Sequence, residues 1–394
     1  MHHSHSWRRS LALAGLLSTT VVGASCQIAD PKPRSQAAAV PAPVMPAPDP
    51  APASEDTGSE NAAPVQRAAA QATARSARSL PAPGPANLTE SREKAIAIIE
   101  SFARSNDAQQ RANAVELAGI APKRLHDVIQ SGLLDTNPGV RSVALITAGR
   151  NKMQEFREII RPLSRDPSGM VRAAAIYALY RFGDEPDQTP LAKMLLTDDS
   201  PWVNRQAAFV LGEIGNPSSL PLLQSASAQR VQQLPPAQQP IFQVQLTEAM
   251  VKVGAEEQRA ALVAALYPTQ SDDAEVAMLA VQAIGETGDK SSIAQLLGLA
   301  QYRDRQGNPY PAELRIAVAS SLGRLGMDTG LPIAQEFLTA KDEGLRAQSA
   351  HALGFIGAGT TKGQASLSLI APMLDDQSEL VRLAAAGAVL RCTK

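Results

Sequence analysis

Apolar residues recur with helical spacing from residue 88 to residue 394, and the pattern itself repeats. In each copy, a reference position is followed three and four places later by small or β-branched apolar residues, such as Ala175 and Ile176. A larger apolar residue, such as Leu179, follows at the seventh place. This spacing puts the apolar side chains on one buried face of an α-helix. The reference positions lie 30 to 39 residues apart, at Arg111, Arg141, Arg172, Asn204, Gln243, Ala277, Arg315, Arg346 and Arg382.

Most of these predicted helices are preceded by another short amphipathic segment. Such segments occupy Met153–Leu163, Pro190–Leu196, Ser219–Ser225, Ile293–Ala300, Leu331–Leu338 and Ser366–Leu374. Two helices in each repeat, with no strand pattern between them, are typical of stacked helical hairpins. The sequence therefore predicts an all-α fold, an α-solenoid of about nine helical hairpins.

Glycine and aspartate mark fixed points of each repeat. Glycine eight places past the reference, as at Gly212 and Gly354, leaves room for a neighbouring helix. Glycine eleven places past it is typical of a left-handed helix end, and occurs at positions 183, 215, 254, 288, 326 and 357. Aspartates just before the helices are expected to cap their free N–H groups, at Asp135, Asp166, Asp199, Asp273 and Asp376.

The repeats share the texture Asp-x(4)-Val-Arg-x(2)-Ala-x(3)-Leu-Gly-x(2)-Gly, seen best at Asp166–Gly183 and partly at Asp135–Gly149 and Asp376–Arg391. This texture resembles the short HEAT-like repeats of bacteria, the type also found in phycobilisome lyases. The resemblance covers residues 88–394 and implies a helical solenoid, but it says little about activity.

In repeats of this type, the reference arginine is expected to pair with Asp or with backbone oxygens between neighbouring units, rather than with a ligand. Three central copies lack that arginine and carry Asn204, Gln243 and Ala277 in its place. A continuous Asp–Arg ladder is therefore expected to break in the middle of the solenoid. The insertion around residues 229–239 is polar and contains prolines, and is interpreted as a plain spacer.

The first 26 residues have the features of an export signal. Arg8 and Arg9 precede a short apolar stretch that ends in small residues. The segment Val22–Cys26 resembles a bacterial lipobox, which implies lipidation of Cys26 after cleavage. An ordinary cleaved signal and a coincidental apolar start remain alternatives, and the paired arginines leave open export by the Sec or the twin-arginine route.

Residues 27–87 contain 12 of the 29 prolines, separated by Ala, Ser and Gln. Such a segment has too little apolar surface to offset the entropy of ordering, so a disordered linker is expected. The predicted organisation is a signal peptide at 1–26, a linker at 27–87 and a solenoid at 88–394. The expected location is the periplasm or outer face of the envelope, membrane-anchored by lipidated Cys26, with a soluble periplasmic or secreted protein as the alternative.

Charge and residue usage argue against several functional classes. Lys and Arg number 37 and Asp and Glu 38, so no basic surface for nucleic acid is evident. Beyond residue 26 the histidines are His126 and His351, which are expected at the surface, and no metal or other cofactor is predicted. The repeated His-Glu pairs of HEAT-like iron hydroxylases are missing. Cys392 is expected either to close the last apolar stripe or to be a free thiol.

The second helix of each hairpin carries a variable stripe five and nine places past the reference, which is expected to be exposed on the concave face. Variation there is typical of a scaffold with a partner-specific surface. Aromatic residues and arginine are enriched at interface hot spots. The candidate partner-binding residues are Tyr177, Arg181, Trp202, Phe209 and Glu213. The alternative is that these residues fill gaps between repeats.

These observations favour a non-catalytic scaffold or adaptor at the bacterial cell envelope, with one or more envelope proteins as partners and a lipid anchor in the membrane. A lyase-like enzyme or chromophore-handling protein is the first alternative, and a cell-wall glycan-binding module is the second. The loop Tyr302–Ala312 is long and carries two tyrosines and two arginines, so it is a second candidate for binding.

Overall fold

The computed structural model describes residues 87–267 and 274–394. The predicted signal peptide with Cys26, the linker up to residue 86, and Asp273 lie outside the described residues. Within the described residues every regular element is helical, which confirms the predicted all-α class.

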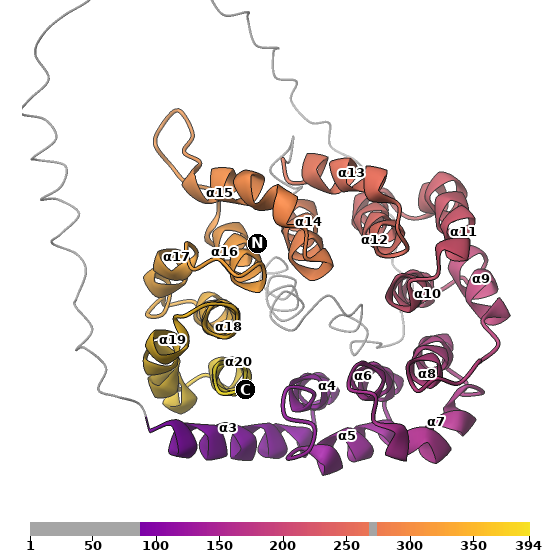
Figure 1. Cartoon of the computed structure of the whole chain (residues 1–394), viewed down its shortest axis with the longest axis horizontal. Coiled ribbons are helices and arrows are strands. Elements are labelled where there is room, and N and C mark those ends of the chain that lie inside the picture. The colour runs from indigo at the N-terminus through magenta and orange to yellow at the C-terminus, as the bar shows by residue number, and fades with distance from the viewer. Residues whose placement is uncertain (1–86, 268–273) are drawn as a thin grey trace, which may run out of the picture. The chain divides into compact units, whose positions relative to one another are not determined.

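The helices alternate between two layers, as Figure 1 shows. The inner layer of the described residues consists of nine helices: α4 (Ala108–Ala118), α6 (Pro138–Arg150), α8 (Gly169–Arg181), α10 (Pro201–Ile214), α12 (Gln239–Lys252), α14 (Ala274–Thr287), α16 (Ala312–Arg324), α18 (Glu343–Gly359) and α20 (Glu379–Cys392). Each contains one of the nine predicted reference positions. The repeat register is therefore confirmed along the whole predicted solenoid.

The outer layer of the described residues consists of the 16-residue helix α3 (Leu88–Ala103) and of shorter helices: α5 (His126–Leu133), α7 (Arg157–Leu163), α9 (Thr189–Leu196), α11 (Leu220–Ser225), α13 (Arg259–Ala264), α15 (Ile293–Gln301), α17 (Leu331–Glu336) and α19 (Gly363–Ile370). Several of them begin or end in a 3-10 turn, such as η2 (Gln154–Phe156) and η3 (Pro217–Ser219). The amphipathic pattern predicted six of these helices, with bounds that differ mainly at the ends, and it did not predict α3, α5 and α13.

The core lies between the two layers and consists of the predicted apolar stripes. Ala175, Ile176 and Leu179 of α8 are all buried, and so are the equivalent residues of the other repeats. Tight helix packing relies on the glycine eight places past the reference. A Cβ on Gly354 would lie 2.7 Å from Ala388 Cα, so α18 and α20 approach closely at that point.

Helix ends follow the predicted glycines in five of six repeats. Glycines 183, 215, 254, 288 and 326 have positive φ. Gly357 was wrongly predicted to end its helix, because α18 continues through it to Gly359. A side chain at Gly357 would collide with Cys392 and Ser366, so the glycine serves close packing and not helix termination.

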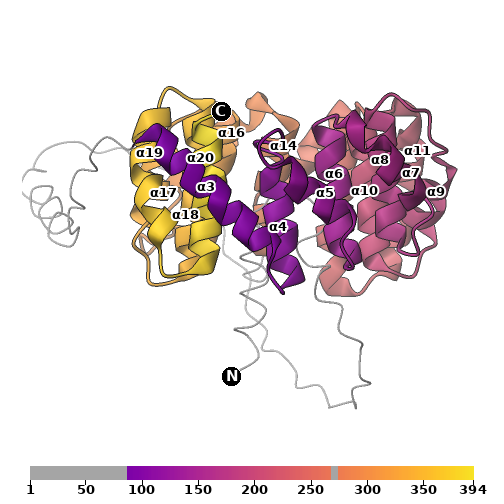
Figure 2. The same cartoon turned by 90° about the horizontal axis from the view of Figure 1, so that it is seen from below.

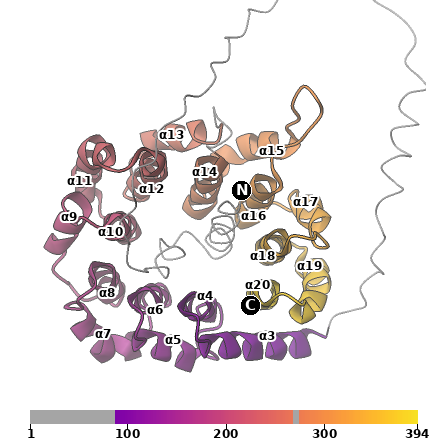
Figure 3. The same ribbon diagram turned by 180° about the vertical axis from the view of Figure 1, so that it is seen from behind.

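The array of helices in residues 87–394 closes on itself, because α3 packs against α20 (Figure 1). Arg92 Nη1 donates hydrogen bonds to the carbonyl and the hydroxyl oxygen of Thr393, at 2.8 and 2.9 Å. Lys94 Nζ lies 2.5 Å from Asp375 Oδ1. Figures 2 and 3 show the first and last helices side by side from two further directions.

Candidate functional site

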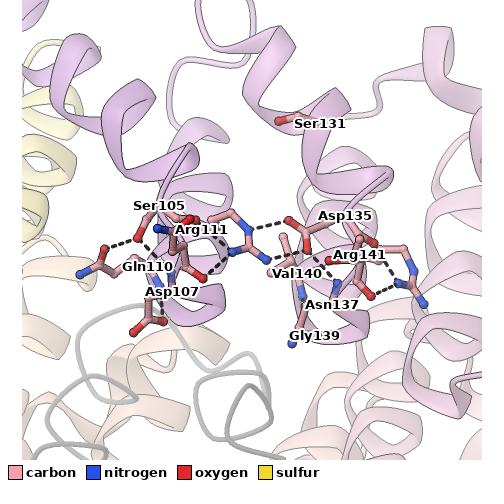
Figure 4. A network of polar contacts seen from close by, with 12 residues as sticks. Ser105, Asp107, Gln110, Arg111, Ser131, Asp135, Asn137, Gly139, Val140 and Arg141 are labelled. Atoms are coloured by element: carbon pink, nitrogen blue, oxygen red, sulfur yellow. Dashed lines mark hydrogen bonds and ion pairs between the residues drawn. The ribbon is translucent and has the colours of Figure 1, made fainter.

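Three of the six reference arginines, Arg111, Arg141 and Arg346, form the predicted contacts with an aspartate of the next repeat, and Figure 4 shows the first two. Arg111 donates from Nε and Nη2 to the two carboxylate oxygens of Asp135 at 2.7 and 2.9 Å, and from Nη1 to the carbonyls of residues 105 and 106. Arg141 bonds Asp166 and two carbonyls in the same way, and Arg346 bonds Asp376. The hydrogen-bond donors of these arginines are thus taken by an aspartate of the next repeat and by nearby carbonyls, which confirms the predicted structural role.

The aspartates lie two residues before the N-cap positions that they were predicted to occupy. Asp135 Oδ1 accepts the N–H of Asn137 at 2.8 Å, and the Asn137 side chain is the actual N-cap of α6. Asp166 and Asp376 bond the N–H of the N-cap residues Ser168 and Ser378. The prediction that these aspartates are themselves N-caps is therefore wrong. Each one stabilises the cap while holding the arginine of the preceding repeat.

The ladder changes partners at α10, where Asn204 replaces arginine. Arg230, from the π-helix η4 (Ala226–Arg230), donates to Asn204 Oδ1 at 3.1 Å and to the carbonyl of Asp198 at 2.6 Å. Asn204 donates to the same carbonyl at 3.1 Å. The inserted segment is therefore not a plain spacer, since it supplies a guanidinium where the repeat lacks one. Asp198, and not Asp199, accepts the N–H of Ser200.

A second set of charges lies on the inner helices at the variable stripe. Glu213 of α10 is 2.7 Å from Lys252 of α12 and 3.7 Å from Arg150 of α6. Helices α6 and α10 are separated by α8, so their side chains meet on the inner side, where the helices converge. Lys252 also pairs with Glu248 at 2.7 Å.

The same arrangement continues around the other half of the circuit. Arg324 of α16 lies 2.6 Å from Glu286 of α14. Arg324 and Arg391 both lie over the ring of Phe355, which belongs to the helix between them. Together these residues form what we call the inner charge cluster, with four positive and four negative charges: Arg150, Lys252, Arg324, Arg391, Glu116, Glu213, Glu248 and Glu286.

Mutual attraction keeps most of this cluster charged despite burial. Burial raises the pKa of Glu213, but Lys252 and Arg150 more than offset it, so the pKa lies below its ordinary value. Burial lowers the pKa of Lys252, yet Glu248 and Glu213 hold it above its ordinary value. The pKa of Glu248 is raised because burial outweighs the attraction of Lys252. A single lysine is thus shared between two carboxylates.

Four of the five predicted partner-binding residues lie at this cluster. The Glu213 carboxylate belongs to it, and Arg150 and Lys252 lie 5.5 and 5.8 Å from the centre of the Phe209 ring. Arg181 lies 5.9 Å from the centre of the Tyr177 ring. Trp202 lies two helical turns from Phe209 on α10, where Arg205 covers its ring at 5.2 Å.

The stripe is more buried than predicted. Tyr177 is 0% exposed and Phe209 9%, and a Cβ on Gly149 would touch the Tyr177 ring at 2.9 Å. Tyr177 therefore fills the space that Gly149 of the preceding repeat leaves, as the alternative interpretation expected for this residue. Convergence of the inner helices explains the burial, because side chains of next-but-one repeats meet.

The sequence reasoning missed the arginine and lysine partners of Glu213, and it missed Arg391. The spacing of the charged residues within the repeats could have predicted this grouping. Arg150, Lys252, Arg324 and Arg391 all stand nine places past a reference position, as Arg181 and Glu213 do. Charges that recur at one register position of successive inner helices must come together when the helices curve inward.

The histidines and the long loop differ in their surroundings. His126 is partly exposed, whereas His351 is buried edge-on to Phe355 at 4.9 Å, so its predicted surface position is wrong. Burial and the charges of Arg391 and Arg324 hold the pKa of His351 well below its ordinary value. In the Tyr302–Ala312 loop, the rings of Tyr302 and Tyr310 stack on each other at 4.3 Å.

Two further findings concern the described part of the chain. It holds no group of three or more His, Cys, Asp or Glu side chains placed to share a metal ion. It also has no helix with the length and apolar character needed to cross a membrane.

Comparison with known sequences agrees with the repeat register. The profile of HEAT repeats matches residues 123–208 and 308–390, and the PBS lyase HEAT-like repeat profile matches residues 203–229. Both profiles support a HEAT-like repeat protein. No curated protein matches it in sequence.

Solved structures with resembling folds are distant from this HEAT-like repeat protein. Human deoxyhypusine hydroxylase in complex with glycerol is 20% identical, with a TM-score of 0.33 over 69% of this chain and 97% of the hydroxylase. An engineered protein is 18% identical, with a TM-score of 0.30 over 79% of this chain and 92% of the engineered one. At these TM-scores and sequence identities, neither structure gives information on function.

Proposed function

We propose that this HEAT-like repeat protein is a non-catalytic scaffold that binds a protein partner against its inner helices, around the inner charge cluster. The observation that carries the proposal is the gathering of charges and aromatic rings at two register positions of the inner helices, five and nine places past the reference. The apolar stripe explains how the repeats pack, but it does not account for these charges.

The chemistry of the cluster suits a protein better than a polyanion. Its four positive charges are matched by four negative ones, so it offers no net attraction to nucleic acid. Arginine and aromatic residues are enriched at the hot spots of protein interfaces, and here they lie together, as Arg181 does with Tyr177. Paired charges of both signs select a partner with a complementary pattern and reject others.

The candidate catalytic groups of the described residues are poorly suited to catalysis. Burial raises the pKa of the Cys392 thiol to about 11, so the thiolate that attacks an electrophile is scarce at neutral pH. His351 is held neutral and buried against Phe355, and its Nδ1 has no hydrogen-bond partner to orient it as a general base. These properties support a binding role over the lyase-like alternative.

The second part of the proposal is an exported protein tethered to the envelope by lipidated Cys26, with residues 27–87 as a spacer. The lipobox-like segment Val22–Cys26 supports it. We expect the mature chain to begin at Cys26 with covalent lipid and to fractionate with membranes, and the Cys26→Ser variant to lose both properties. Mass spectrometry of the mature N-terminus checks this. An unmodified N-terminus on a soluble chain would rule out the tether and leave the soluble periplasmic alternative.

The binding role is tested by affinity capture from solubilised envelopes. Arg181→Glu reverses a partly exposed charge beside Tyr177, so we expect capture of the partner to fall about tenfold or more while the helical content is retained. Arg165→Glu is the matched control, because it makes the same charge change at an exposed position between α7 and α8. Equal capture by both variants and the unmodified chain would contradict binding at the inner helices.

A further inference from the structure

Two guanidinium groups converge on one phenyl ring within the inner charge cluster. The Cζ atoms of Arg324 and Arg391 lie 3.8 and 4.4 Å from the centre of the Phe355 ring. The arginines belong to α16 and α20, and Phe355 belongs to α18 between them. Two like charges thus share a small site on the inner side of three successive repeats.

The two arginines differ in their partners. Arg324 Nη1 lies 2.6 Å from the Glu286 carboxylate. Among the described residues Arg391 has no hydrogen bond or ion pair, and its Nη1 atom is buried without an acceptor. Glu116 and Glu286 attract Arg391 only from a longer range, and the nearby His351 is uncharged. Burial and the repulsion of Arg324 lower the pKa of Arg391 to about 10.

The buried Nη1 atom of Arg391 is unfavourable without an acceptor, because its hydration is lost and nothing replaces it. The planar fork of an arginine matches the two oxygens of a carboxylate, and the neighbouring Arg324 adds a second positive charge. We propose that Arg391, with Arg324 beside it on Phe355, binds a carboxylate group of the partner, either an acidic side chain or a chain end. This assignment rests on the proposed scaffold function and names the chemistry that one part of its surface recognises.

The surroundings favour a carboxylate over a phosphate. The inner charge cluster is neutral overall, so a bound group with two negative charges leaves more net negative charge there than a group with one. A single negative charge balances the one guanidinium that lacks a direct partner. Both guanidiniums contact the Phe355 ring, which reduces the cost of ordering them around a ligand.

The test uses 4-fluorophenylalanine incorporated at position 355 of the full chain, with the fluorine resonance as the reporter. Acetate is titrated at constant ionic strength, and inorganic phosphate is titrated separately. We expect a saturable shift with acetate, weakened about tenfold or more by Arg391→Gln. Arg165→Gln is the matched control, since it makes the same substitution at an exposed arginine between α7 and α8 and should leave the shift unchanged.

A shift that does not saturate, or that survives Arg391→Gln undiminished, would overturn the assignment. A stronger response to phosphate than to acetate would overturn the choice of carboxylate. N-acetylalanine and N-acetylglutamate methylamide then separate a chain end from an acidic side chain, and saturable binding of neither would also count against the site. Partner capture is measured independently, so a chain that captures its partner but ignores acetate refutes the carboxylate site and leaves the scaffold intact.

Discussion

At the scale of single residues, each ladder carboxylate has two tasks that only an ionised group can perform together. Asp135 accepts two hydrogen bonds from Arg111 of the preceding repeat and one from the N–H of Asn137 in its own. Burial raises its pKa, but these hydrogen bonds more than offset burial, so the pKa lies below its ordinary value. A charge that is easier to form in the folded chain than in the unfolded chain stabilises the fold.

This gives a pH-dependent prediction for Asp135→Asn. Because the folded pKa is below the unfolded value of about 3.9, the carboxylate contributes fully above about pH 4 and progressively less as the pH falls through the folded pKa. We expect the variant to lose about 1–2 kcal/mol of unfolding free energy at pH 7, and the difference from the unmodified chain to shrink toward pH 3. Urea unfolding at several pH values measures this.

Asp199→Asn is the control, since Asp199 is exposed and no hydrogen bond holds its side chain. It should unfold like the unmodified chain at every pH. A loss in Asp135→Asn that is constant from pH 7 to pH 3 would show that the carboxylate acts through its shape and not through its charge.

At the scale of elements, a glycine at a helix contact and a glycine on an open helix face have effects that experiment can separate. In Gly354→Ala, the added Cβ would meet the backbone of Ala388 at 2.7 Å, so α18 and α20 must move apart. We expect a loss of about 1–3 kcal/mol. Gly298→Ala adds a methyl to α15 where no atom lies within 4 Å, and should gain about 0.5–1 kcal/mol from a stiffer unfolded chain. Urea midpoints that shift in the same direction for both would contradict this account.

The element scale also shows what the sequence could predict. Helices and register follow from residues that recur in each repeat, and the Arg–Asp contacts follow from residues that recur in several, because repeats contact their neighbours in similar ways. The burial of Tyr177 and the grouping of Arg150 with Glu213 depend on contact between next-but-one repeats. Such contact arises from curvature, which no single repeat encodes. The role of Arg230 could not be predicted for a related reason. Arg230 belongs to an insertion outside the repeat register, and it hydrogen-bonds Asn204, which stands where other repeats have arginine.

At the scale of the whole folded unit, closure is the feature furthest from sequence reasoning. Its contacts join residues far apart in the chain, as Arg92 and Thr393 are by 301 positions, and they occur once only. Closure also joins the inner charge cluster across the junction, because Glu116 of α4 attracts Arg391 of α20. An opened circuit would lose this attraction, so the first and last repeats both determine the surface that a partner meets.

Closure can be tested at the contact between α20 and α4. A Cβ on Gly387 would lie 2.5 Å from Leu117 Cδ2, so the side chain introduced by Gly387→Leu must push the last repeat away from the first. We expect a larger radius of gyration in small-angle X-ray scattering and faster amide exchange in α3. Leu117→Ala in the same chain removes the obstructing side chain, and the double variant should regain the original scattering. A single variant that only melts earlier, with unchanged scattering, would show that the circuit absorbs the clash locally and stays closed without this contact.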